Sequence, residues 1–133
     1  MIDLNLETAE RVARAAIAKA KSMGKPMTVS IVDESGRLVL CLKGDGTGFL
    51  TTETSRAKAV AAAAFRGATR DFVEMAKTNP FWSSLPALTR GEVLPTGGAV
   101  PIKLNGRVIG AIGCGGGTPD EDHECAVAGA AAA

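Results

Sequence analysis

The fold of this chain is decided by residues 97–129, which read GGAVPIKLNGRVIGAIGCGGGTPDEDHECAVAG. In residues 99–104 and 107–114, β-branched side chains alternate with other residues, which is the period of a β-strand. Asn105-Gly106, between these two segments, is the dipeptide most typical of a two-residue type I′ turn. The sequence therefore predicts a tight antiparallel hairpin.

A glycine-rich elbow, residues 115–118, and a new helix follow this hairpin. The glycines allow a sharp turn without a Cβ penalty, and Thr118, Pro119 and Asp120 supply an N-cap, a preset φ and a favourable negative charge for a helix. Two interpretations of the elbow are open. Its N–H groups bind a carboxylate or phosphate, or the elbow is only a structural turn. The acids in the first helical turn favour the structural turn because they repel an anion.

The remainder of the chain predicts one more hairpin and three more helices. Apolar residues recur with a helical period before Gly24 and with a period of two on both sides of Glu34-Ser35-Gly36. The predicted elements are a helix over about residues 6–23 capped by Asn5 and ended by Gly24, strands over 27–33 and 37–43, an alanine-rich helix from Thr51 or Thr52 to Phe65 or Arg66, and a shorter helix over about residues 70–77 capped by Thr69.

Residues 78–96 differ in composition from the rest of the chain. They contain three prolines and two aromatic residues, which are Pro80, Pro86, Pro95, Phe81 and Trp82. The prolines argue against a long regular element, and the aromatic side chains argue against a flexible linker. We therefore expect an ordered loop or lid.

The length of 133 residues and the hydrophobic content of 46% are those of one globular domain. The order of elements predicts an α+β domain over residues 1–133, in which helices flank an antiparallel sheet. The net charge of +1 argues against binding to nucleic acid or to an anionic membrane. No apolar stretch is long enough to cross a membrane and the N-terminus does not resemble a signal peptide, so we expect a cytoplasmic protein.

The three cysteines, Cys41, Cys114 and Cys125, show no metal-binding or redox spacing and predict reduced, mostly buried thiols. Alanine dominates the predicted helices, whereas the chain has one Trp, four Phe and no Tyr. The burial available within one chain is therefore modest. We expect a homo-oligomer in which part of the apolar surface, including alanine-rich helix faces, is buried between subunits.

Five segments of the chain follow one another in a characteristic order. They are VDESGRLV, GDG, SRAKAVAAAAF, GGAVPIKLNGRVIGAIGCGG and PDEDHECAVAGA. This order, over nearly the whole chain, resembles the GlcG/HbpS-like family, which includes the C-terminal domain of PduO-type proteins. The resemblance implies a profilin-like α/β/α fold and symmetric oligomers. Some members bind haem or take part in its degradation, and others accompany glycolate, diol or corrinoid metabolism. Haem or another tetrapyrrole is thus a candidate ligand.

His123, the single histidine of the chain, is the candidate axial ligand for haem iron. Asp120 stands three residues before His123 and four before Glu124, so these side chains are candidates for a shared metal site. His123 and Glu124, however, are adjacent and diverge. The favoured alternative is a solvated helix start, in which the acids complement the helix dipole and the histidine lies at a surface or an interface.

Lys58 is the candidate acid, base or carboxylate anchor, because it lies in a helix otherwise built largely of alanine. It is predicted to project over a pocket floored by small residues and to reach toward Asp45 of the GDG loop. An apolar setting lowers the pKa of a lysine and suits it to proton transfer. The alternative is that Lys58 reaches solvent or pairs with Glu53 or Asp45 for structure. Arg56 is the candidate anchor for a substrate carboxylate.

Two further groups of residues are predicted to surround this pocket. Gly97 and Gly98, shortly before Pro101, permit close approach of a ligand or of another backbone segment. Phe65, Phe81 and Trp82 form the wall of a site for a planar ligand, or are simply part of the core.

Three classes of function follow from these candidates. The first is a small-ligand-binding protein, with haem or another tetrapyrrole as the candidate ligand. The second is a cofactor-independent enzyme of isomerase or lyase type that moves a proton on an oxo-acid-like metabolite, using Lys58 with Asp45 and Arg56. The third is a purely structural assembly partner. The first class is our prediction, with the ligand pocket at or near a subunit interface.

Overall fold

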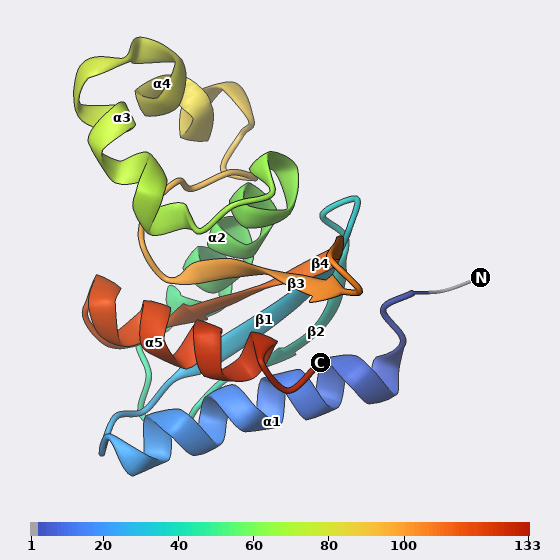
Figure 1. Cartoon of the computed structure of the whole chain (residues 1–133). Helices are drawn as coiled ribbons and strands as arrows, with labels where there is room; N and C mark the ends of the chain where they lie inside the picture. Colours follow the sequence, from blue (N-terminus) through green and yellow to red (C-terminus); the bar gives the residue numbers. More distant parts are fainter. Residues whose placement is uncertain (1–2) are drawn as a thin grey trace.

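The computed structural model describes residues 3–133, in which four strands form one antiparallel sheet (Figure 1). The strands are β1 (Thr28–Asp33), β2 (Leu38–Leu42), β3 (Ala99–Leu104) and β4 (Arg107–Gly115), in the order β2-β1-β4-β3. The helices are α1 (Leu6–Ser22), α2 (Thr51–Phe65), the short 3₁₀ helix η1 (Thr69–Phe72), α3 (Val73–Thr78), α4 (Pro80–Leu88) and α5 (Pro119–Ala130). The sheet thus joins two local hairpins through their inner strands, β1 and β4.

Helices cover both faces of the sheet, so the chain forms three layers. Figure 1 shows α1 and α5 side by side on one face and α2 on the other, with α3 and α4 beyond α2. This arrangement confirms the predicted α/β/α order, an antiparallel sheet flanked by helices. Among residues 3–133, no helix combines the length and apolar character needed to span a membrane.

The two faces of the sheet differ in the size of their side chains. Toward α1 and α5 the sheet presents large aliphatic residues, which are Val29, Ile31, Val100, Ile102 and Ile112. Toward α2 it presents small ones such as Ala99 and Ala111, against which the fully buried Ala62 of α2 packs. The alanine-rich face of α2 is therefore covered by the chain's own sheet. The expectation that this face makes contacts between subunits is wrong.

The backbone of α2 closely approaches the sheet at Gly113 of β4. A Cβ atom at this position would overlap the carbonyl oxygen of Ser55 and lie 2.9 Å from the backbone nitrogen of Ala59. The hydroxyl groups of Ser30 and Ser55 form a hydrogen bond of 2.8 Å in the same interface. Glycine at position 113 is thus what allows the helix backbone to touch the strand.

Three predictions that rested on local signals are confirmed. Asn105 and Gly106 have φ angles of 52° and 79°, as a type I′ turn requires. Asn5 caps α1 by accepting a hydrogen bond of 2.8 Å from an N–H group of the first turn. Thr118 caps α5, and Glu121 completes a capping box by accepting from the Thr118 N–H.

Residues 80–88 form a helix, so the prediction of a loop over residues 78–96 is wrong for this part. Pro80 is the first residue of α4, where an N–H group is not needed. Asn79 caps the helix by accepting a hydrogen bond of 3.0 Å from the backbone of Phe81. Pro86 lies in the last turn, so the hydrogen bond that it removes falls close to the point where the helix ends.

Thr69, which was predicted as a helix cap, has another role, whereas α2 begins at Thr51 and ends at Phe65 as predicted. The Thr69 hydroxyl donates to the carbonyl oxygen of Ala99 at 3.3 Å and accepts from the Ala99 N–H at 3.0 Å, which anchors η1 to β3. The residue before α2 is Leu50, which makes no side-chain cap bond, and the Thr51 hydroxyl donates backward to the carbonyl oxygen of Gly48. The Thr69 hydroxyl therefore binds the backbone of β3 instead of capping the helix that follows it.

Candidate functional site

A buried ion pair joins α2 to α5. Lys58 of α2 is only 5% exposed, and its Nζ lies 3.1 Å from Oδ2 of Asp122 and 3.4 Å from the carbonyl oxygen of Gly97. The other carboxylate oxygen of Asp122 accepts a hydrogen bond of 2.9 Å from the N–H of Gly117. The pair thus holds together α2, α5, the elbow and the segment before β3. We call Lys58, Asp122, Gly97 and Gly117 together the Lys58 network.

The N–H groups of the elbow point at carboxylates of the same chain. Gly117 donates to Asp122, and Thr118 donates to Glu121 at 2.9 Å. These two acids occupy the positions that a bound carboxylate or phosphate would take. The geometry therefore favours the structural interpretation of the elbow.

Gly98 shows how tightly the Lys58 network is packed. Its φ angle is 127°, and a Cβ atom there would lie 2.7 Å from Nζ of Lys58 and 2.8 Å from Cβ of Asp122. Lys58 thus lies beside the two glycines, as the sequence predicted. Its ammonium group and Asp122 fill the space in which a ligand was expected.

The predicted approach of Lys58 to Asp45 is wrong. Asp45 is exposed in the loop that precedes α2, and Lys58 binds Asp122 instead. The reason is geometric, because Thr51 begins α2 directly after this loop and Lys58 follows seven residues later. That separation is about 10 Å along a helix axis. The loop is held by other contacts, among them a donation from Lys43 Nζ to the carbonyl oxygen of Thr47 at 3.0 Å.

Arg56 points away from the Lys58 ammonium group, as expected for side chains two residues apart on a helix. Its guanidinium group lies 3.1 Å from a carboxylate oxygen of Glu92 and 3.7 Å from one of Glu53. These ion pairs tie α2 to the segment that follows α4. The structure therefore does not place Arg56 and Lys58 around one substrate.

The ring of His123 is packed inside the molecule. The residue is 8% exposed, and its Nδ1 is a buried side-chain nitrogen without a hydrogen-bond partner among the described residues. His123 is therefore not at the exposed surface of the chain, which was one of the two places given for it in the favoured alternative. Burial, reinforced by the positive charge of Arg70, lowers the pKa of the imidazole below its ordinary value of 6.5, while nearby acids partly oppose the shift. His123 is thus neutral at physiological pH.

The proposed cluster of Asp120, His123 and Glu124 is not a metal site. Asp120 and Glu124 are exposed, whereas His123 is buried. Within residues 3–133, no three His, Cys, Asp or Glu side chains gather as they would to bind a metal ion. His123 could therefore act only as a single ligand, of the kind that a haem iron takes from a protein.

A model of the haem-degrading HbpS-like proteins matches residues 4–131. The chain belongs to the HbpS-like family. A 15.0 kDa protein encoded in the dhaT-dhaS intergenic region of Citrobacter freundii is 30% identical over 120 residues, which cover 90% of this chain and 84% of that protein.

Two solved structures resemble the HbpS-like chain closely. A PduOC:heme complex is 26% identical, with a TM-score of 0.87 over 98% of this chain and 94% of the other. A double mutant of HbpS from Streptomyces reticuli is 32% identical, with a TM-score of 0.84 over 96% of this chain and 85% of the other. The chain thus has the same fold as these two structures.

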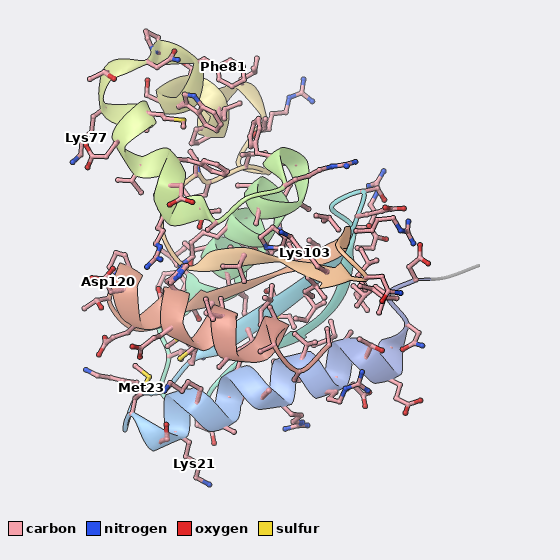
Figure 2. All side chains as sticks on the ribbon, viewed as in Figure 1. Lys21, Met23, Lys77, Phe81, Lys103 and Asp120 are labelled. Carbon is pink, nitrogen blue, oxygen red and sulfur yellow. The ribbon has the colours of Figure 1, made fainter. Side chains whose placement is uncertain are left out.

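In this HbpS-like chain the aromatic residues pack against one another above α2. The ring centroids of Phe65 and Trp82 lie 4.6 Å apart, and those of Phe72 and Trp82 lie 4.9 Å apart in a stacked arrangement. Phe81 packs edge-on against Trp82 at 5.4 Å and is exposed at the far end of the molecule (Figure 2). Phe72, for which the sequence predicted no role, belongs to the same group of rings. These rings therefore form a small separate core, which agrees with the alternative that they are core residues and not the wall of a ligand site.

Depressions on the surface of the HbpS-like chain lie away from most of the predicted site residues, although Asp45 lines two of them. Four such depressions, of about 390, 350, 200 and 370 Å³, occur on the described residues, and none is lined by Lys58, Gly97, Gly98 or His123. Pro101, half-buried on β3, lines none of them either. The space beside Gly98 is instead taken up by the Lys58 ammonium group and the Asp122 side chain, which would lie 2.7 and 2.8 Å from a Cβ atom at that position.

Proposed function

We propose that this protein binds haem. The observation that carries the proposal is the match to a PduOC:heme complex over 98% of the chain and 94% of that structure. The family described as haem-degrading and HbpS-like, matched over residues 4–131, supports the same class of ligand. Three free thiols favour a reducing compartment such as the cytoplasm.

His123 is the residue that we propose as the axial ligand. It is the only imidazole of the chain, it is neutral at physiological pH, and its buried Nδ1 has no partner among residues 3–133. Haem, when bound, supplies an iron centre for which a neutral imidazole nitrogen is a common ligand. Because the ring is almost fully buried, we expect haem uptake to require local opening near Arg70 and Asp71 of η1.

Titration with hemin tests both parts of the proposal. We expect a saturable Soret band with the unmodified chain, and a weakening of binding by about tenfold or more in His123→Ala because the iron loses its protein ligand. Glu124→Ala is the matched control, since this neighbouring side chain is exposed, and it should bind haem like the unmodified chain. The measurement is the absorbance spectrum over roughly 350–700 nm, where haem proteins absorb.

The two possible failures of this experiment are distinguishable. Absence of a saturable Soret band in the unmodified chain would reject haem binding altogether. An unaltered band in His123→Ala, with both variants folded by circular dichroism, would reject only the assignment of His123.

We also propose that the protein is a homo-oligomer. Phe49 is 84% exposed at the start of α2, and Leu50 and Leu88 are exposed as well. Phe49 and Leu50 are adjacent, and apolar side chains exposed together are a candidate contact surface for another copy of the chain. Phe49→Asp should therefore reduce the particle mass measured by light scattering, while Phe81→Asp should have less effect because that ring is already packed on Trp82. An unchanged mass for Phe49→Asp would exclude Phe49 from the interface.

A further inference from the structure

A groove runs between α1 and the edge strand β2. It consists of two adjoining depressions, of about 350 and 370 Å³, that share Ile17, Gly44 and Asp45. Small-molecule sites in proteins have volumes of about 300–1,000 Å³, so the groove is large enough for a ligand. Every residue of β2 is at least partly exposed, because α1 covers this edge of the sheet only in part.

The lining of the groove is mixed, and its polar groups surround an apolar floor. The floor is formed by Ile17 and Ala20 of α1, Met27, and Cys41 and Leu42 of β2. Ala20 and Met27 are buried beneath the surface, whereas the other three are half-buried and still reachable from solvent. A concave apolar floor favours the apolar part of a ligand, because its burial removes nonpolar surface from water.

The rim of the groove is mainly positive. It carries four cations and one carboxylate, which are Arg14, Lys21, Lys25, Lys43 and Asp45. Lys25 and Lys43 already bind other groups of the chain. Arg14 and Lys21 make no ion pair with any residue in the range 3–133. Figure 2 shows Lys21 extending freely from the end of α1.

We infer that this groove binds an amphipathic anion, a small molecule with an apolar body and a carboxylate or sulfonate head. The body lies on the floor beside Ile17 and Leu42, and the head lies near Arg14 of the same depression. Lys21, about 10 Å further along α1, adds positive charge at the other end of the groove. The groove borders β2, whereas His123 lies near η1, which is anchored to β3 at the opposite edge of the sheet. This site is therefore separate from the proposed haem ligand.

Fluorescence titration with anilinonaphthalene sulfonate, an amphipathic anion, tests the role of the rim. The double variant Arg14→Gln/Lys21→Gln should bind the dye about five- to tenfold more weakly, since each lost cation is worth roughly a two- to fivefold change. The matched control is Arg37→Gln/Lys103→Gln, which removes the same charge from exposed positions outside the groove. This control and His123→Ala should bind the dye like the unmodified chain.

The thiol of Cys41 provides a second measurement inside the groove. Cys114 and Cys125 are fully buried, so Cys41 is the cysteine expected to react first with a chromogenic disulfide reagent. Saturating dodecanoate should slow this reaction about fivefold or more by covering the thiol. The Arg14→Gln/Lys21→Gln variant should need a higher dodecanoate concentration for the same protection.

Both measurements must agree for the inference to stand. Equal dye binding by the two double variants, with unchanged melting temperatures, would overturn it because the rim cations would then be irrelevant. Reaction of Cys41 at the same rate with and without dodecanoate would overturn it as well, since the ligand would then lie elsewhere.

Discussion

Replacing Lys58 by methionine should lower the free energy of unfolding by about 3–5 kcal/mol. In the unmodified chain, Nζ of Lys58 lies 3.1 Å from Oδ2 of Asp122. The substitution removes this cation and leaves the Asp122 carboxylate buried without it. The aliphatic part of the side chain is retained, so the loss reflects the charge and its hydrogen bonds. Urea denaturation followed by circular dichroism measures the change.

Two further variants separate the buried pair from a general effect of charge. Lys58→Met/Asp122→Asn should recover part of the lost stability, because the amide oxygen of asparagine can still accept from the Gly117 N–H. Lys77→Met, which removes an exposed cation paired with Glu74, should cost less than about 1 kcal/mol. If Lys58→Met and Lys77→Met lowered the free energy of unfolding equally, the buried ion pair would stabilise the chain no more than an exposed one.

Replacing Gly113 by alanine should be at least as disruptive, with an expected loss of about 3 kcal/mol or more. The new Cβ would overlap the carbonyl oxygen of Ser55, so that α2 would have to move away from the sheet. That movement would separate the Ser30 and Ser55 hydroxyls. Thermal unfolding and the yield of folded protein measure the effect.

Gly48→Ala is the matched control for this substitution. A Cβ atom at Gly48 would meet nothing within 4 Å, and the residue does not have a positive φ angle. Alanine there should change stability by less than about 1 kcal/mol, and a small gain is expected because the unfolded chain becomes less flexible. If Gly113→Ala were as well tolerated as this control, the close contact between α2 and β4 would not be an important constraint.

The elements predicted correctly from sequence depend on contacts between neighbouring residues. The Asn105-Gly106 turn and the caps at Asn5 and Thr118 require only a few residues each, so their signals are complete within short segments. Pro80, Pro86 and Pro95 argue against a long regular element, but they do not exclude the short helix at residues 80–88, in which Pro80 is the first residue and Pro86 lies in the last turn.

The candidate site was harder to predict because its partners are distant in the chain. Asp122 lies 64 residues beyond Lys58, and no local pattern connects them. The acids at the start of α5 lie at the helix N-terminus as predicted, but one of them, Asp122, also faces inward and binds Lys58. The burial of His123 likewise depends on tertiary packing that places Arg70 and Asp71 nearby, which the sequence of α5 alone does not reveal.

The central pairing of β1 with β4 has a consequence for how the chain folds. Each hairpin can form by itself, on a timescale of about 1–10 μs, because its strands are joined by a short turn. The pairing of Thr28 with Gly115, in contrast, requires closure of most of the polypeptide into one loop. We therefore expect the encounter of two preformed ribbons to limit the folding rate, as is usual where contacts have high sequence separation.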